Sequence, residues 1–174
     1  MRIACVLGRG FEDSEFRVPY DQFRHAGHAV MVIGLKKGAE LAGKNGKERV
    51  KAEAAVGEVK AADFDALFIP GGHSPDELRA DSTMVQFVRG FRDKPIFAIC
   101  HGPQLLITAG LVKGRMMTAW KTVQIDLACA GANVSDEAVV VDHNLVTSRK
   151  PEDLAAFVRE SLAQIAHGAG AHAH

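Results

Sequence analysis

A regular alternation of short apolar runs with amphipathic helical patterns is the feature of this sequence that most restricts its fold. The runs carry no polar alternation, which is typical of strands that are covered on both faces. They span residues 3–7, 29–33, 66–69, 96–99, 138–141 and 145–147. Strands that alternate with helices predict an α/β fold, namely a doubly wound, mostly parallel, flavodoxin-like sheet with helices on both faces.

Two helical stripes can be read from the spacing of large apolar residues. The first is formed by Phe16, Tyr20 and Phe23, and the second runs through residues 154–165. Pro151 suits the first position of the second helix, because its missing N–H group would have no partner there. We therefore expect one helix soon after the first strand and another near the end of the chain.

Two stretches interrupt the alternation. Residues 38–53 contain Asn45-Gly46, a dipeptide that favours a tight hairpin turn, so we expect a small β-hairpin insertion there. The end of the chain is rich in glycine and alanine and has no apolar stripe. We expect one α/β domain over residues 1–166 and a flexible C-terminal tail over residues 167–174.

The charge balance and the cysteine content restrict the partners and the compartment. Lys plus Arg and Asp plus Glu number 21 each, so the net charge is zero and stable nucleic-acid binding is disfavoured. Three cysteines form an odd and sparse set, which suits a reducing compartment better than a disulfide-linked secreted fold. The N-terminus has no signal-peptide pattern, and no apolar run approaches the ~20 residues of a membrane helix. We expect a cytoplasmic protein.

The most informative segment surrounds Cys100, which follows the apolar run at 96–99 and precedes a Gly-Pro pair typical of a helix start. A nucleophile on such a strand-to-helix turn is held at the carboxyl edge of the sheet, as in a nucleophile elbow. The unpaired N–H groups of the helix start favour the thiolate, so we expect a lowered thiol pKa and an accessible sulfur. The alternative is a buried, inert core cysteine, which is the better interpretation of Cys5 and Cys129.

Other groups can join Cys100 at that edge. His101 is either a general base or acid with an oriented ring, or a partly exposed helix-start histidine. Glu12 lies in the loop after the first strand, where it either stays protonated and hydrogen-bonds the sulfur or favours a helix dipole. The backbone N–H groups at Gly71, Gly72 and His101 are candidates for an oxyanion hole.

No metal site or cofactor motif is recognisable in the sequence. His25 and His28, like His172 and His174, form close pairs, but a third and a fourth ligand with suitable spacing are missing. The glycine pair after the third apolar run matches neither the dinucleotide fingerprint nor the P-loop. We expect a protein without metal and without cofactor.

Several motifs together resemble one known family. They are Phe11-Glu12-Asp13, Ile69-Pro70-Gly71-Gly72, Ala98-Ile99-Cys100-His101-Gly102-Pro103-Gln104, Gly131-Ala132-Asn133 and Val146-Thr147-Ser148-Arg149. Over residues 1–166 the chain resembles the PfpI family of intracellular proteases, in the superfamily of the parkinsonism-associated deglycase, with a class I glutamine amidotransferase-like fold. The stretch GGHSPDELRAD is similar to the bacterial general-stress branch of that family.

This resemblance implies a role for each candidate site residue. Cys100 matches the nucleophile of the family, His101 its neighbouring histidine, and Glu12 the carboxyl group that hydrogen-bonds the thiolate or its oxidised form. In the proteases of the family, an acidic residue from an adjacent subunit completes the triad. That position is Asp76 here, one methylene shorter than the usual glutamate. A homo-oligomer, at least a dimer, is therefore implied.

Three functions remain open after this comparison. The first is a stress-response, cysteine-dependent hydrolase or lyase that removes methylglyoxal-type adducts from proteins or nucleotides, or hydrates the aldehyde itself. The second is an intracellular peptidase with Cys100, His101 and Asp76 assembled across subunits. The third is a non-enzymatic redox sensor or chaperone, in which Cys100 is oxidised to sulfinate beside protonated Glu12. A glutamine amidotransferase is disfavoured, because His143 lies in a turn pattern and not in the required His-x-Glu pair.

Overall fold

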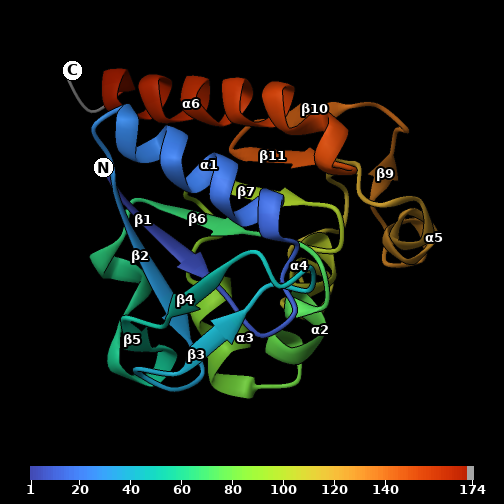
Figure 1. Ribbon diagram of the computed structural model, residues 1–174. Helices are drawn as coiled ribbons and strands as arrows, with labels where there is room; N and C mark the ends of the chain where they lie inside the picture. Colours follow the sequence, from blue (N-terminus) through green and yellow to red (C-terminus); the bar gives the residue numbers. More distant parts are fainter. Residues whose placement is uncertain (172–174) are drawn as a thin grey trace.

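The structure, a computed structural model, describes residues 1–171. The strands of its central sheet are β1 (Arg2–Val6), β2 (Ala29–Gly34), β5 (Ala54–Ala55), β6 (Ala66–Ile69), β7 (Ile96–Ile99), β10 (Val139–Asp142) and β11 (Leu145–Ser148). Their order across the sheet is β10-β11-β7-β6-β1-β2-β5 (Figure 1). Neighbouring strands run parallel except β10 and β11, which form an antiparallel pair at one edge. The predicted mostly parallel α/β fold is confirmed.

Helices cover both faces of this sheet. They are α1 (Asp13–His25), α2 (Ser74–Arg79), α3 (Ser82–Arg89), α4 (Pro103–Thr108), α5 (Lys121–Cys129) and α6 (Leu154–Ala171), with 3-10 turns η1 (Val56–Glu58), η2 (Ala61–Asp63) and η3 (Pro151–Asp153). α1 and α6 pack side by side on one face, and α2, α3 and α4 cover the other (Figure 1). Within residues 1–171, no helix combines the length and the apolar character needed to cross a membrane.

Strand side chains alternate between two hydrophobic cores. Ile3 and Cys5 of β1 belong to the core under α1 and α6, where they join Phe23. Ala4 and Val6 of the same strand belong to the core under α2, α3 and α4. All five residues are fully buried. A sheet with two covered faces therefore explains why the strand sequences are continuously apolar.

Two small strand pairs lie outside the central sheet. The hairpin predicted within residues 38–53 is present as the antiparallel strands β3 (Glu40–Ala42) and β4 (Arg49–Lys51). The second pair is parallel and consists of β8 (Met116–Met117) and β9 (Asn133–Val134). The sequence does not predict this second pair, because a strand of two residues leaves no periodic pattern.

The end of the chain differs in part from the expectation of a flexible tail over residues 167–174. α6 continues through His167 to Ala171. Alanine has the highest helix propensity, so an alanine-rich stretch can extend an existing helix even though glycines weaken it. Residues 172–174, the rest of the expected tail, lie outside the described residues.

Candidate active site

Cys100 occupies the sharp turn between β7 and α4. Its backbone φ is 63°, a left-handed conformation that is uncommon for residues other than glycine. Two hydrogen bonds hold it there: the Cys100 N–H donates to Ser148 O (3.0 Å), and the Cys100 carbonyl accepts from the Trp120 N–H (3.0 Å). A strained residue that is fixed by its neighbours is typical of functional sites. The turn has the form of a nucleophile elbow.

The His101 ring lies beside this sulfur. Its Nδ1 is 3.4 Å from Cys100 Sγ, and the ring stacks on Trp120 with a centroid distance of 6.3 Å. Burial lowers the pKa of His101, and the charges of Lys44 and His73 lower it further, so the ring is neutral at pH 7. A neutral imidazole has one nitrogen that accepts a proton, so His101 can take the proton of the thiol.

A second titratable group beside Cys100 is the carboxyl group of Glu15, in the first turn of α1. A Cβ atom on Gly71 would collide with both the Glu15 carboxyl and Cys100 Cβ, so the two side chains meet at that glycine. Glu15 is fully buried, and its Oε1 accepts a hydrogen bond from the Gly71 N–H (3.1 Å). Its Oε2 makes no hydrogen bond of ordinary geometry within residues 1–171.

Glu15 is mainly protonated at neutral pH. Burial, followed by the negative charge of Glu12, raises the pKa of Glu15 to about 8. Hydrogen bonds with Cys100 and with the Gly71 backbone lower it, but by less. A buried carboxyl group that keeps its proton at pH 7 can donate it to a neighbouring sulfur or oxygen.

This geometry differs from the assignment made from the sequence, which gave the place beside the sulfur to Glu12. Glu12 is the N-cap of α1, where its Oε1 accepts from the Ser14 N–H (3.4 Å) and its Oε2 pairs with Lys44 Nζ (3.0 Å). Glu15 follows three residues later, on the buried side of the helix with Phe16. The sequence did contain a signal for Glu15: it directly precedes Phe16, the first residue of the apolar stripe, so its carboxyl group adjoins the buried side of that helix.

The surroundings of Cys100 raise the pKa of its thiol, whereas the sequence predicts a lowered pKa. The largest cause is burial, since Cys100 is only 7% exposed, and the next is the negative charge of Glu15. The His101 backbone N–H and the charge of Lys44 act in the opposite direction. α4 has only six residues, and its N-terminus does not outweigh the burial. The sulfur therefore needs a base to become a thiolate.

The backbone groups predicted to form an oxyanion hole have three different surroundings. The Gly71 N–H donates to Glu15, and the His101 N–H donates to the Cys100 sulfur. Gly72 forms an isolated antiparallel bridge with Phe11, which joins the loop after β6 to the loop after β1. An oxyanion hole built from these groups stays a prediction.

The bridge at Gly72 gives a direct test of how rigidly the site is built. Gly72 has a φ of 80°, and a Cβ atom there would collide with the backbone of Gly10, Phe11 and Glu12. We expect Gly72→Ala to lower the free energy of unfolding by about 3 kcal/mol or more, because alanine is strained there and the facing backbone must move.

Gly46→Ala is the matched control for this substitution. Gly46 has a φ of 72°, but no atom lies within 4 Å of its Cβ position. Its expected cost is about 1 kcal/mol, from the left-handed conformation alone. Urea unfolding measures both variants. Equal losses would show that the bridge between the two loops imposes no packing constraint.

Asp76, the acidic residue that the resemblance assigns to the triad, does not meet His101 within the chain. It is exposed on α2, and its N–H donates to His73 O (3.2 Å). Within residues 1–171, no hydrogen bond or ion pair joins its carboxylate to another residue. A catalytic contact from Asp76 therefore requires a second subunit.

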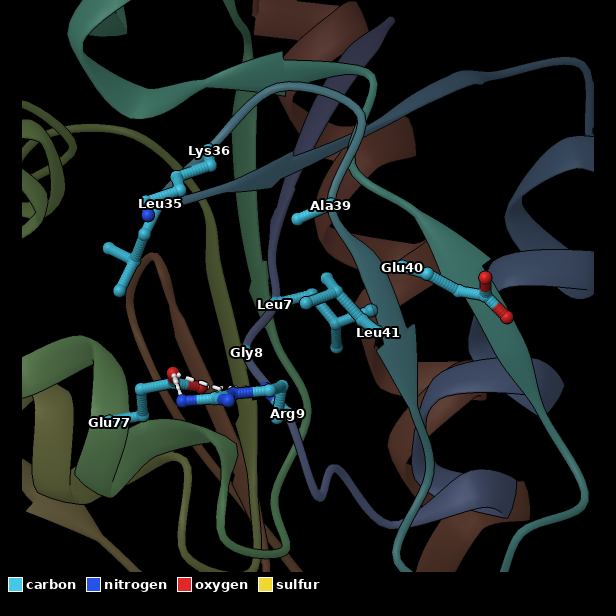
Figure 2. A pocket seen from close by; sticks show the side chains of 9 residues that line it. All are labelled: Leu7, Gly8, Arg9, Leu35, Lys36, Ala39, Glu40, Leu41 and Glu77. Atoms are coloured by element: carbon cyan, nitrogen blue, oxygen red, sulfur yellow. Dashed lines mark hydrogen bonds and ion pairs between the residues drawn. The ribbon is translucent and has the colours of Figure 1, made fainter.

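A cavity of about 330 Å³ lies near the carboxyl ends of β1 and β2, but Cys100 is not part of its wall. Figure 2 shows Leu7 and Leu41 in the middle of its lining, with Arg9 and Glu77 pointing toward one another below them. Arg9 and Glu77 are joined by an ion pair of 2.9 Å. This cavity is thus separate from Cys100.

A second cavity reaches a residue that contacts Cys100. Its volume is about 410 Å³, and its lining includes Trp120, Lys121, Arg149 and Lys150. Trp120 donates its backbone N–H to Cys100 O, and its ring stacks on His101. Trp120 is thus shared between the wall of this cavity and the surroundings of Cys100, which does not itself line the cavity.

Comparison with known proteins assigns these features to one family. The sequence matches the profile of the DJ-1/PfpI family over residues 1–164. It is similar to protein/nucleic acid deglycase 2 of Escherichia coli (52% identity, covering 92% of this chain and 95% of the relative) and to general stress protein 18 of Bacillus subtilis (51%, covering 93% and 96%). It is also similar to YraA of Bacillus subtilis, which its name proposes to be a cysteine protease (50%, covering 92% and 96%).

A solved structure gives the same result. The two-domain protein of Anabaena variabilis with DJ-1/ThiJ/PfpI-like and ferritin-like domains superposes on this chain with a TM-score of 0.92 and 38% identity. The match covers 96% of this chain and 48% of that chain. The chain belongs to the DJ-1/PfpI family.

Proposed function

We propose that the chain is a stress-response, cysteine-dependent hydrolase or lyase that acts on methylglyoxal-type carbonyl adducts or on the free aldehyde. The supporting relatives carry the names protein/nucleic acid deglycase 2 and general stress protein 18. The observation that carries the proposal is the grouping of Cys100 on its elbow with neutral His101 and protonated Glu15. All three cysteines are free, which suits a cytoplasmic enzyme in a reducing compartment.

The first chemical step is addition of the thiol across the substrate carbonyl. The Cys100 sulfur forms a bond to the carbonyl carbon while its proton passes to His101 Nδ1, which is 3.4 Å from the sulfur. The carbonyl π electrons move to the oxygen, which takes a proton from the Glu15 carboxyl group. The result is a neutral thiohemiacetal beside an imidazolium and a carboxylate. The net proton count is unchanged.

A peptidase is the second candidate, because one relative at 50% identity is named as a proposed cysteine protease. It would require Asp76 of a second subunit to orient His101, and it would require a peptide to reach a cysteine that is 7% exposed. We propose a homo-oligomer, at least a dimer, for either activity. Analytical ultracentrifugation of the full chain measures that state, and a purely monomeric protein would exclude a triad assembled across subunits.

The decisive experiment presents purified protein with methylglyoxal, a glycated thiol and a fluorogenic peptide, each compared with Cys100→Ser. Carbonyl or adduct turnover that is lost in the variant supports the proposed function. Peptide turnover that is lost in the variant supports the peptidase instead. If neither occurs and mild peroxide adds two oxygens to Cys100, the chain is a redox sensor and the enzymatic proposal fails.

A further inference from the structure

The tip of the hairpin β3–β4, residues 43–48, is bound to the start of α1 by one carboxylate. Asp13 Oδ1 accepts from the Asn45 N–H, and Oδ2 accepts from the Lys47 and Glu48 N–H groups, each at 2.9 Å. Burial raises and these backbone bonds lower the pKa of Asp13, with a net lowering, so Asp13 is charged at neutral pH. Three charge-assisted hydrogen bonds from one turn fix the hairpin tip relative to α1.

Two further contacts fit the hairpin tip to the start of α1 and to the loop before it. A Cβ atom on Gly43 would collide with the Asp13 carboxylate, so only glycine allows the observed approach. The Lys44 N–H donates to Phe11 O at 2.9 Å. The position of Lys44 is therefore set by contacts on both sides of it, and not by its side chain alone.

Lys44 is the charged side chain that this arrangement brings to the Cys100 site. Its Nζ lies 3.0 Å from Glu12 Oε2, and its side chain is 39% exposed. Its positive charge lowers the pKa of Glu15, of Cys100 and of His101. The contacts place it there: the Glu12 N–H donates to Gly71 O at 3.1 Å, and Gly71 is the residue at which Glu15 and Cys100 meet. Lys44, paired with Glu12, therefore lies at the junction of α1 with the turn after β7.

We propose that Lys44 supplies the positive charge that allows Cys100 to form its thiolate, and that Asp13 is the positioning residue that holds Lys44 there. The proposal rests on the proposed function only in taking Cys100 as the nucleophile. It assigns a chemical role to the hairpin insertion, which lies outside the central sheet. Without Lys44, a thiolate would form near the carboxylate of Glu12 with no opposing side-chain charge from the hairpin.

The charged and titratable groups around the sulfur come from every segment packed against it. Glu12 and Glu15 belong to the start of α1. The negative charge of Glu12 raises the pKa of Glu15, and that of Glu15, when it is ionised, raises the pKa of Cys100. His101 is in the turn of Cys100 itself, and its backbone N–H donates to the sulfur. His73, in the loop before α2, acts on His101. Lys44 adds a positive charge from the hairpin, which pairs with Glu12 and lowers the pKa of Glu15 and of Cys100.

The test measures the alkylation rate of Cys100 by iodoacetamide from pH 6 to about pH 11.5, a range that extends upward because burial raises the pKa of the thiol. The reaction is followed in the full chain by mass spectrometry of the Cys100 peptide. We expect Lys44→Met to raise the pH midpoint by about one unit and to slow alkylation at pH 7.5 about tenfold, because less thiolate is present. Lys44→Arg keeps the charge and is expected to stay within about twofold of the parent rate. Lys47→Met removes a lysine from the same hairpin tip and is expected to react like the parent.

Asp13→Asn tests the positioning role separately. It keeps the Lys44 side chain but weakens the three hydrogen bonds that backbone N–H groups donate to the carboxylate. We therefore expect the midpoint of the alkylation rate to shift upward, as is expected for Lys44→Met. If Asp13→Asn does not fold, the Lys44 and Lys47 variants still decide the proposal. An unchanged midpoint in Lys44→Met, or an equal shift in Lys47→Met, overturns it.

This readout separates the two proposals. Iodoacetamide is neutral and its reaction needs no turnover, so the Lys44 result stands whatever the natural substrate is. If Cys100→Ser abolishes carbonyl turnover while Lys44→Met leaves alkylation unchanged, the proposed function survives and the role of Lys44 is wrong. If the parent protein has no turnover but the alkylation midpoint shifts as expected, the role of Lys44 is supported and the proposed function is wrong.

Discussion

Cys100→Ser is expected to lower turnover of the active substrate by about 10³-fold or more. A serine hydroxyl is far less acidic than a thiol, and the base available here, His101, is suited to a thiol proton. Removal of a nucleophile in other enzymes costs losses on the order of 10⁴–10⁶ in kcat, with a residual rate from binding and polarisation. The loss is measured by steady-state kinetics with whichever of the three test compounds (methylglyoxal, the glycated thiol or the fluorogenic peptide) the parent protein turns over.

The matched control is Cys129→Ser. Cys129 is exposed at the C-terminal end of α5, whereas Trp120, which contacts Cys100, caps the N-terminal end of that helix. This variant removes a reactive thiol and is expected to keep the parental kcat within about twofold. Turnover that persists above a tenth of the parental value in Cys100→Ser would show that another group performs the chemistry.

Glu15→Gln is expected to stabilise the protein while it lowers activity. The pKa of Glu15 rises from its ordinary value of 4.5 to about 8 on folding. The folded state thus holds a proton that the unfolded chain releases, so the stability contributed by Glu15 is full below pH 4.5. It is lost progressively as the pH rises to about 8. Glutamine, which has no proton to lose, does not carry this penalty.

The expected gain for Glu15→Gln is about 2–4 kcal/mol at pH 8, and it should vanish near pH 4. Urea unfolding at pH 4, 6 and 8 measures it, and the curve for the variant should be flatter than the parental curve over that range. Glu12→Gln is the control, because it removes an ion pair with Lys44 and should give no stabilisation. An unaltered pH dependence in Glu15→Gln would show that Glu15 is ionised in the folded protein.

The same variant reports on the mechanism. Glutamine keeps a hydrogen-bonding group at the Gly71 N–H but has no proton to transfer to a carbonyl oxygen. We therefore expect kcat to fall by about 10²-fold or more, the usual contribution of a general acid. A variant that is both more stable and less active is typical of a residue retained for chemistry at a cost in stability.

The secondary structure and the elbow could be predicted from the sequence because both depend on local patterns. The apolar runs that form β1, β6 and β7 need to be covered on both faces, and this follows from the composition of each run alone. The turn at Cys100 needs a small residue soon after it and a helix start, and both adjoin it in the sequence. Asn45-Gly46 likewise favours a tight turn by its own backbone preferences, and the hairpin β3–β4 forms around it.

Only the tertiary structure decided which carboxyl group meets the sulfur and which way the thiol pKa moves. Glu12 and Glu15 are both near the first strand in sequence, and both are buried. The rotation of α1 against the sheet directs Glu15 toward Gly71 and Cys100 and leaves Glu12 paired with Lys44. Glu15 and Cys100 are 85 positions apart in the chain. A pKa depends on burial and on charges from every segment within several ångströms. Such distances are set by packing, so no local pattern could have given them.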